Sequence, residues 1–182
     1  LVAATIAATG AASAWGQQWP DKPVRILVTF PSGGGTEIQA RLLATVFQKS
    51  MGQNFIIDNR TGAGGLIAGQ LAVDFPPDGN TILFTSGSIS VVVTLYAKRM
   101  KFDPLVDLQP ISWLSSTPLV LSIHPSVPAK NVRQLVALAK TKPGAPNGGG
   151  NTPGSTSHLT AEMLNQVAGI KSQVITYRGG GP

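Results

Sequence analysis

The sequence contains no cysteine, which excludes disulfide bonds, thiolate metal ligands and cysteine nucleophiles. Charged residues make up only 12% of the 182 residues, and aromatic residues only 6%. Lys and Arg outnumber Asp and Glu by 14 to 8, but the basic residues are scattered and no run of five occurs. Nucleic-acid binding requires a clustered basic surface and aromatic stacking platforms, so we do not expect it. A positive field that attracts a small anion is the better expectation.

The motifs that bind nucleotides or support hydrolysis are also missing. The nearest match to the phosphate-binding loop G-x-x-x-x-G-K-[ST] spans residues 64–70 and has Gln70 in place of the lysine. The dinucleotide pattern G-x-G-x-x-G fails at every glycine cluster, and neither G-x-S-x-G nor S-x-x-K occurs. His124 and His158 lie in unrelated contexts, without an acidic neighbour at ligand spacing. We therefore predict that the protein is not an enzyme and holds neither a metal ion nor a cofactor.

The N-terminal segment LVAATIAATGAASA is small and apolar and ends in Ala12-Ser13-Ala14. This composition is typical of the apolar region of a secretory signal peptide and its cleavage site. A basic region and an initiator Met are absent, so a disordered or buried N-terminal tail remains an alternative. No later apolar run is long enough to span a bilayer. We predict that residues 1–14 are a signal-peptide remnant of an exported soluble protein.

Strand and helix patterns alternate in the first half of the chain. Strands are expected at residues 25–30, 54–58 and 81–85, and helices at 37–50, 65–75 and 88–99. Parallel neighbours need crossover connections, so this order predicts a parallel sheet with helices packed on it. We assign residues 20–108 to a first α/β lobe.

The pattern changes after Asp103-Pro104. Residues 108–123 show no helical period and are expected to be extended segments that cross between two lobes. Helices at 132–140 and 155–168 and a strand at 173–177 follow. We assign residues 109–182 to these crossover strands and an incomplete second α/β lobe, since the chain stops in what should be a loop. The default ligand site is the cleft between the lobes.

Three small polar loops each precede a predicted helix: residues 31–36 (PSGGGT), 85–88 (TSGS) and 151–157 (NTPGSTS). In an open α/β sheet, such loops lie at the carboxyl ends of the strands, where ligands bind. The N-terminus of a helix offers free N–H groups and partial positive charge, and hydroxyl groups add donors. Each loop alone is as well explained by a capped turn, but three together favour a shared anion site.

Several segments, in this order, resemble the periplasmic solute-binding proteins of the tripartite tricarboxylate transporter family, also called the Bug or TctC-like family. They are PDKP, FPSGGGTEIQAR, NRTGAGG, PPDGNTILFTSGS, GSTSHLTAEML and YRGGGP, and the resemblance covers residues 19–182. It implies a two-lobe periplasmic-binding-protein fold (Venus flytrap, type II-like), with the second lobe incomplete in this chain. It also implies capture of a small organic carboxylate in the periplasm, for delivery to the membrane permease subunits of such a transporter.

The resemblance further implies that backbone amides and hydroxyl groups of both lobes hold the ligand carboxylate. The residues at the matching positions are Gly33, Gly34, Thr36, Glu37, Ser86, Gly87, Asn151, Ser155, Thr156, His158 and Tyr177. The family usually has Asp where this chain has Glu37, whose carboxylate can bond loop amides or an ammonium group on the ligand. Gly62 to Gly65 is expected to shape the turn into its helix. Two alternatives stay open: an anion-binding enzyme on a similar scaffold, and a non-functional truncated fragment.

Overall fold

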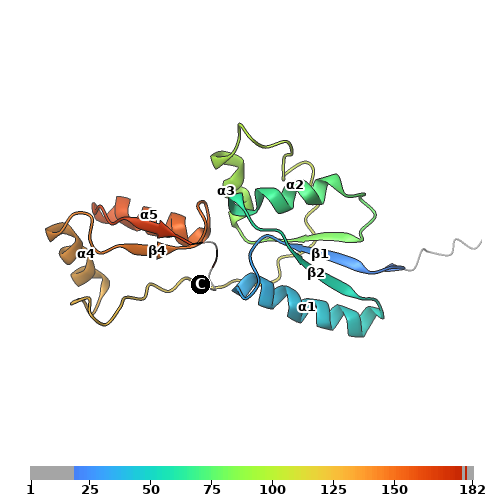
Figure 1. The fold of residues 1–182 in the computed structure, drawn as a ribbon, viewed down its shortest axis with the longest axis horizontal. Coiled ribbons are helices and arrows are strands. Elements are labelled where there is room, and N and C mark those ends of the chain that lie inside the picture. Colours follow the sequence, from blue (N-terminus) through green and yellow to red (C-terminus); the bar gives the residue numbers. More distant parts are fainter. Residues whose placement is uncertain (1–18, 178, 180–182) are drawn as a thin grey trace, which may run out of the picture.

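The computed structural model describes residues 19–177 and residue 179. It shows two groups of helices and strands, which we call the first and second lobes, joined by a long extended segment (Figure 1). The predicted signal-peptide remnant, residues 1–14, lies outside the described residues.

The first lobe is built on a parallel sheet with the strand order β2-β1-β3. The strands are β1 (Val24–Val28), β2 (Phe55–Asn59) and β3 (Thr81–Phe84). The central strand is almost wholly buried, with only Arg25 exposed, as expected for a parallel strand covered on both faces. The parallel α/β architecture predicted from the sequence is therefore confirmed.

Helices cover both faces of this sheet, with α1 on one side and α2 on the other (Figure 1). The helical elements are α1 (Gly35–Met51), the 3-10 turn η1 (Ala63–Gly65), α2 (Leu66–Asp74) and α3 (Ser88–Leu95). Helix α1 ends at Gly52, whose φ of 72° is left-handed, as its sequence predicts. The rings of Phe47 and Phe55 lie 5.2 Å apart and join α1 to β2 in the core.

The apolar residues of α1 do not all face the core, contrary to their regular spacing. Leu43 and Phe47 pack against the core, whereas Ile38, Leu42 and Val46 are 52%, 65% and 59% exposed. The small residues of the helix, rather than this stripe, lie closest to the sheet, because short side chains allow close approach.

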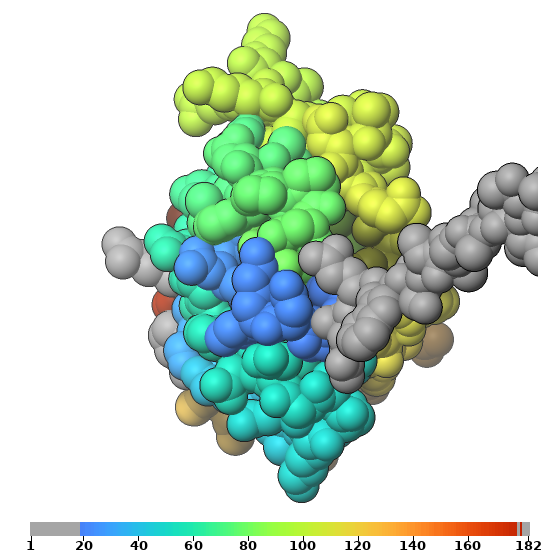
Figure 2. Space-filling view, turned by 90° about the vertical axis from the view of Figure 1, so that its right-hand side faces the viewer, coloured from blue at the N-terminus to red at the C-terminus, as the bar shows by residue number. Residues whose placement is uncertain are grey.

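An extended segment, residues 108–124, leads from the first lobe to the second without regular helix or strand. It lies along the flank of the first lobe, where its yellow atoms are visible in Figure 2. The Ser115 hydroxyl donates to the side-chain oxygen of Gln39 on α1 at 2.8 Å. Most of its apolar side chains are exposed, Trp113 at 84%.

The second lobe has a two-stranded parallel sheet and two helices. Its elements are α4 (Val132–Thr141), β4 (Gly148–Gly150), α5 (Thr156–Ala168) and β5 (Val174–Thr176). Asn131 caps α4 by accepting from the Gln134 amide. The helical spacing of Met163 and Val167 predicts that both lie in the core of α5, but they are 64% and 76% exposed, so this prediction was wrong.

Strand β4 was missed by sequence reasoning, because glycine is depleted in strands. The fold nevertheless requires a small residue there: a Cβ atom on Gly150 would lie 3.3 Å from His158 Cα, so α5 packs directly on the strand backbone.

Candidate functional site

The first predicted ligand loop follows the central strand β1 and forms a tight turn into α1. The Gly34 amide donates to the Pro31 carbonyl at 3.4 Å. Gly33 has a φ of 84°, a conformation that disfavours side chains, and nothing lies within 4 Å of a Cβ placed there. Gly33 is exposed, Thr36 is half-buried, and the N-cap Gly34 has no side chain to bond the free amides of the helix. The loop therefore presents backbone, and not side chains, at the end of the strand.

Glu37 lies in the first turn of α1 but points back into the protein. Its side chain is only 4% exposed. One carboxylate oxygen accepts from the Gly33 amide at 3.4 Å, and the other accepts from Arg41 Nε. A negative charge in this turn is favoured by the helix dipole.

The second loop follows β3 and leads into α3. Ser88 is fully buried, and its hydroxyl lies 2.9 Å from that of Ser86, whose oxygen also accepts from the Ser88 amide at 3.3 Å. Gly87 is exposed, and nothing lies within 4 Å of a Cβ atom placed on it. The two strands feeding both loops are neighbours in the sheet, which brings the loops to one edge of the lobe.

The third loop, in the second lobe, is held by its own hydroxyl groups. Ser155 is 2% exposed and caps α5 by accepting from the His158 amide at 3.3 Å. The Asn151 amide donates to the Ser157 hydroxyl at 3.0 Å. Thr156 is exposed, and Asn151 is half-buried.

His158 bonds its own loop through one ring nitrogen. The Gly154 amide donates to His158 Nδ1 at 3.4 Å. Accepting this bond leaves the proton of a neutral ring on Nε2, the other nitrogen. The imidazole thus keeps one donor for a further partner. Tyr177, at the end of β5, is 51% exposed and lies beside Gly149.

The two lobes contact each other near these loops, and each contact involves a glycine. A Cβ atom on Gly154 would lie 2.8 Å from Leu95 Cδ1 at the end of α3. A Cβ atom on Gly64 would lie 3.6 Å from the Pro153 carbonyl oxygen, and one on Gly179 would overlap the Pro31 ring. Sequence reasoning missed these contacts, although glycines recur in the loops of both lobes.

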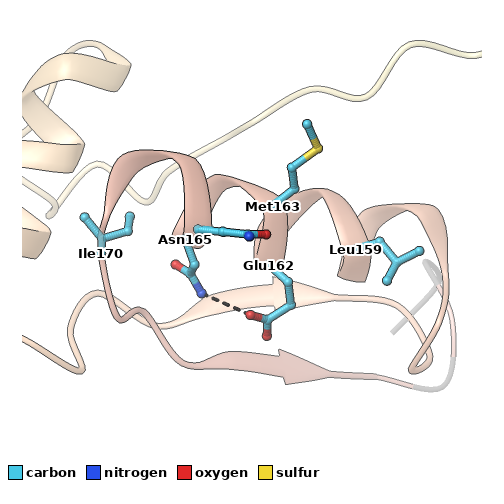
Figure 3. A pocket seen from close by; sticks show the side chains of 6 residues that line it. Leu159, Glu162, Met163, Asn165 and Ile170 are labelled. Carbon is cyan, nitrogen blue, oxygen red and sulfur yellow. Dashed lines mark hydrogen bonds between the residues drawn. The ribbon is translucent and has the colours of Figure 1, made fainter. Parts of the chain in front are cut away.

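Two surface hollows lie elsewhere, and neither is lined by a predicted ligand residue. One follows α5 (Figure 3) and is lined by Leu159, Glu162, Met163, Asn165, Gln166 and Ile170. The other lies between the extended segment and α4, at residues 123–134. Both are open surface features, so the loops at the lobe contact remain the candidate site.

Within residues 19–177 and 179, no group of three or more His, Asp or Glu side chains is placed to hold a metal ion. No helix in that part of the chain is both long and apolar enough to cross a membrane. In the same residues His124 is exposed and bonds Ser126, at 2.8 Å between Nδ1 and the hydroxyl.

Comparison with known proteins decides the family. The profile of the "Tripartite tricarboxylate transporter family receptor" matches residues 39–182. The chain belongs to this family. It is 35% identical over 165 residues to the protein BugT of Bordetella pertussis, covering 90% of this chain and 51% of that relative. A second relative, from Bordetella bronchiseptica, is 34% identical over 188 residues, with coverage of 100% and 54%. The chain thus spans about half the length of the relatives it matches.

Several solved structures share the fold. A protein of R. palustris solved with adipate superposes with a TM-score of 0.83 at 34% identity, covering 88% of this chain and 54% of that one. MatC of Rhodopseudomonas palustris, solved with bound malate, gives a TM-score of 0.78 at 27% identity, with coverage of 90% and 56%. The periplasmic binding protein BugD gives 0.73 at 26% identity, with coverage of 88% and 54%. The predicted periplasmic-binding-protein fold is therefore confirmed.

Proposed function

We propose that the protein to which this chain belongs is a periplasmic solute-binding protein that captures a small organic carboxylate between its two lobes. The observation that carries the proposal is that the two lobes contact each other at the first and third loops, in a chain of the receptor family. The second loop follows β3, the neighbour of the strand that leads into the first loop. Two related structures were solved with dicarboxylates, adipate and malate.

The chemistry of the loops suits a carboxylate. Backbone amides at the start of α1 and hydroxyl groups of the other two loops donate hydrogen bonds, and helix N-termini favour negative charge. A hydrogen bond to a charged group contributes about 1.5–3 kcal/mol. Four or five such bonds therefore supply the roughly 8 kcal/mol of micromolar affinity.

We assign ligand contact to residues of these three loops and to Tyr177. The proposed contacts are Gly33, Gly34, Thr36, Ser86, Gly87, Asn151, Ser155, Thr156, His158 and Tyr177. His158 would donate from Nε2, because its Nδ1 already accepts from Gly154. Ser155 would donate from its hydroxyl, because its amide already donates to the Thr152 carbonyl at 2.9 Å, while the hydroxyl oxygen caps α5 only by accepting.

Binding would favour a closed arrangement of the lobes because the ligand contacts both of them. The extended segment, at residues 109–123, would act as the hinge. The loaded protein would then deliver its ligand to the membrane subunits of a tripartite tricarboxylate-type transporter. Family membership supports this last step.

Calorimetry with adipate and malate tests the binding proposal. Gly34→Val should abolish binding, because Gly34 is buried and a Cβ atom there would lie 3.4 Å from the Pro31 carbonyl oxygen, so the new side chain would deform the turn. Gly148→Val is the matched control, since that glycine has open space and lies at the far end of β4. Unchanged affinity in Gly34→Val would refute contact with this loop. Stoichiometric recovery of unaltered ligand would separate a binding protein from an enzyme.

A further inference from the structure

Glu37 is the only charged side chain that is buried among the residues the structure describes, at 3% exposure. Burial of an ionised carboxylate is unfavourable unless the group is paired and hydrogen-bonded. Its burial beside the candidate site therefore calls for a specific role.

The carboxylate is fully engaged by its own helix and loop. Oε2 accepts from the Gly33 amide at 3.4 Å, and Oε1 accepts from Arg41 Nε, one turn further along α1. Gly34, at the N-cap, has no side chain that could bond the free amides. Glu37 is the third residue of the helix and reaches back, as the acid of a capping box does, to a backbone amide before the helix, here that of Gly33.

We infer that Glu37 is a positioning residue that holds the glycine loop in its ligand-binding shape, and that it does not touch the ligand. The inference rests on the proposed function and assigns a role within the same site. With one oxygen fixing the Gly33 amide, the neighbouring glycines lose much of their backbone freedom before the ligand arrives. A loop ordered in advance binds more tightly, because less ordering is left for the binding step.

Arg41 makes this arrangement compatible with an anionic ligand. A lone buried carboxylate close to the loop would repel the ligand, since like charges interact strongly where water is excluded. The guanidinium group of Arg41 balances that charge, and its side chain is 60% exposed. Contact of Glu37 with a ligand ammonium group is disfavoured because the side chain is only 4% exposed.

NMR relaxation of the ligand-free chain tests the positioning role directly. We expect backbone order parameters of Gly33 to Gly35 near 0.85 in the wild type, falling below about 0.6 in Glu37→Ala. Glu37→Gln keeps an oxygen acceptor for the Gly33 amide and should restore most of the order. The matched control is Glu162→Ala, which removes the other glutamate, an exposed one on α5. Unchanged order in Glu37→Ala overturns the inference.

A chemical-shift measurement covers the case in which Glu37→Ala fails to fold. In Glu37→Gln the charged acceptor becomes neutral, so the amide proton resonance of Gly33 must move. An unmoved resonance shows that the bond to Gly33 does not exist, and the inference falls.

Ligand binding then separates positioning from contact. We expect Glu37→Ala to weaken binding of malate and of aspartate by the same factor, about 10- to 100-fold, as for the loss of one charge-assisted hydrogen bond. Glu37→Gln should weaken both by less than about fivefold. Selective loss of aspartate in Glu37→Gln would indicate contact with the ammonium group and overturn the inference. If the wild type binds neither compound, nor adipate, the proposed function fails, while the order parameters still decide the role of Glu37.

Discussion

Leu95 of the first lobe and Gly154 of the second lobe are in direct contact, and a Cβ atom on Gly154 would lie 2.8 Å from Leu95 Cδ1. The end of α3 therefore fits against the backbone of the third ligand loop. A side chain at residue 154 would require the Leu95 side chain to rotate away or the lobes to separate at the edge of the proposed cleft.

Gly154→Ala should weaken carboxylate binding about tenfold without removing a ligand contact, because it disfavours the closed arrangement. Calorimetry measures the effect. Gly144→Ala is the matched control, since that glycine has a similar φ of 88° against 82° but nothing within 4 Å of a Cβ atom. Adding Leu95→Ala should restore part of the affinity. A double variant as weak as Gly154→Ala alone would contradict the contact.

Gly69→Ala should destabilise the protein by about 1–3 kcal/mol through overpacking. In an open helix the same change stabilises by up to about 1 kcal/mol, but here the new Cβ would lie 2.5 Å from Cζ of the buried Phe102. Urea unfolding gives the free-energy difference. Gly35→Ala serves as control, because the space around that helical glycine is open. A stability gain in Gly69→Ala would show that the ring moves aside.

Asn131→Ala should lower the stability of the second lobe by about 1 kcal/mol, the usual contribution of an N-cap side chain. The side-chain oxygen of Asn131 accepts from the Gln134 amide at 2.9 Å. Asn131→Asp keeps that acceptor and should therefore keep the stability that Asn131→Ala loses. Thermal unfolding followed by circular dichroism compares the three proteins. Equal unfolding midpoints would show that the Asn131 cap does not stabilise α4.

Asp78 should make stability fall in acid. The amide of Asn80, with the Lys22 side chain as a second donor, lowers the pKa of the Asp78 carboxyl from 3.8 to about 2. A carboxyl with a lowered pKa stabilises the fold above its unfolded pKa and loses that contribution as pH falls towards its folded value. The stability difference between wild type and Asp78→Asn should thus shrink between pH 4 and pH 2. A difference that stays constant over this range would contradict the assignment.

The sequence pattern predicted the strands and helices of the first lobe, but it missed a strand of the second lobe. β1 is a continuous apolar run between turn signals, and such runs predict buried parallel strands reliably. β4 was not predictable, because its strand conformation arises from pairing with β5 and from the close approach of α5, not from the propensity of glycine. A local sequence pattern does not contain information on contacts between residues that are far apart in the sequence, such as those of β4 with β5.

In the candidate site, too, the sequence predicts the loops but not the direction or the distant contacts of single residues. The three loops were predictable because short runs of glycine and hydroxyl residues directly precede predicted helices. The inward direction of Glu37 was not, since a glutamate in the first turn of a helix can turn towards the loop or away from it. The contact between Pro31 and Gly179 joins residues from opposite ends of the described chain, and no local signal records it.

The central place of β1 in the strand order β2-β1-β3 has a geometric consequence. The chain leaves β1 towards one neighbour, through α1, and later returns past it to the other, through α2 on the opposite face (Figure 1). The two connections diverge above the carboxyl end of β1, and ligands of open α/β sheets bind at such a topological switch point. The glycine loop stands at this point, so sequence changes in it can alter ligand contacts while the sheet beneath stays the same.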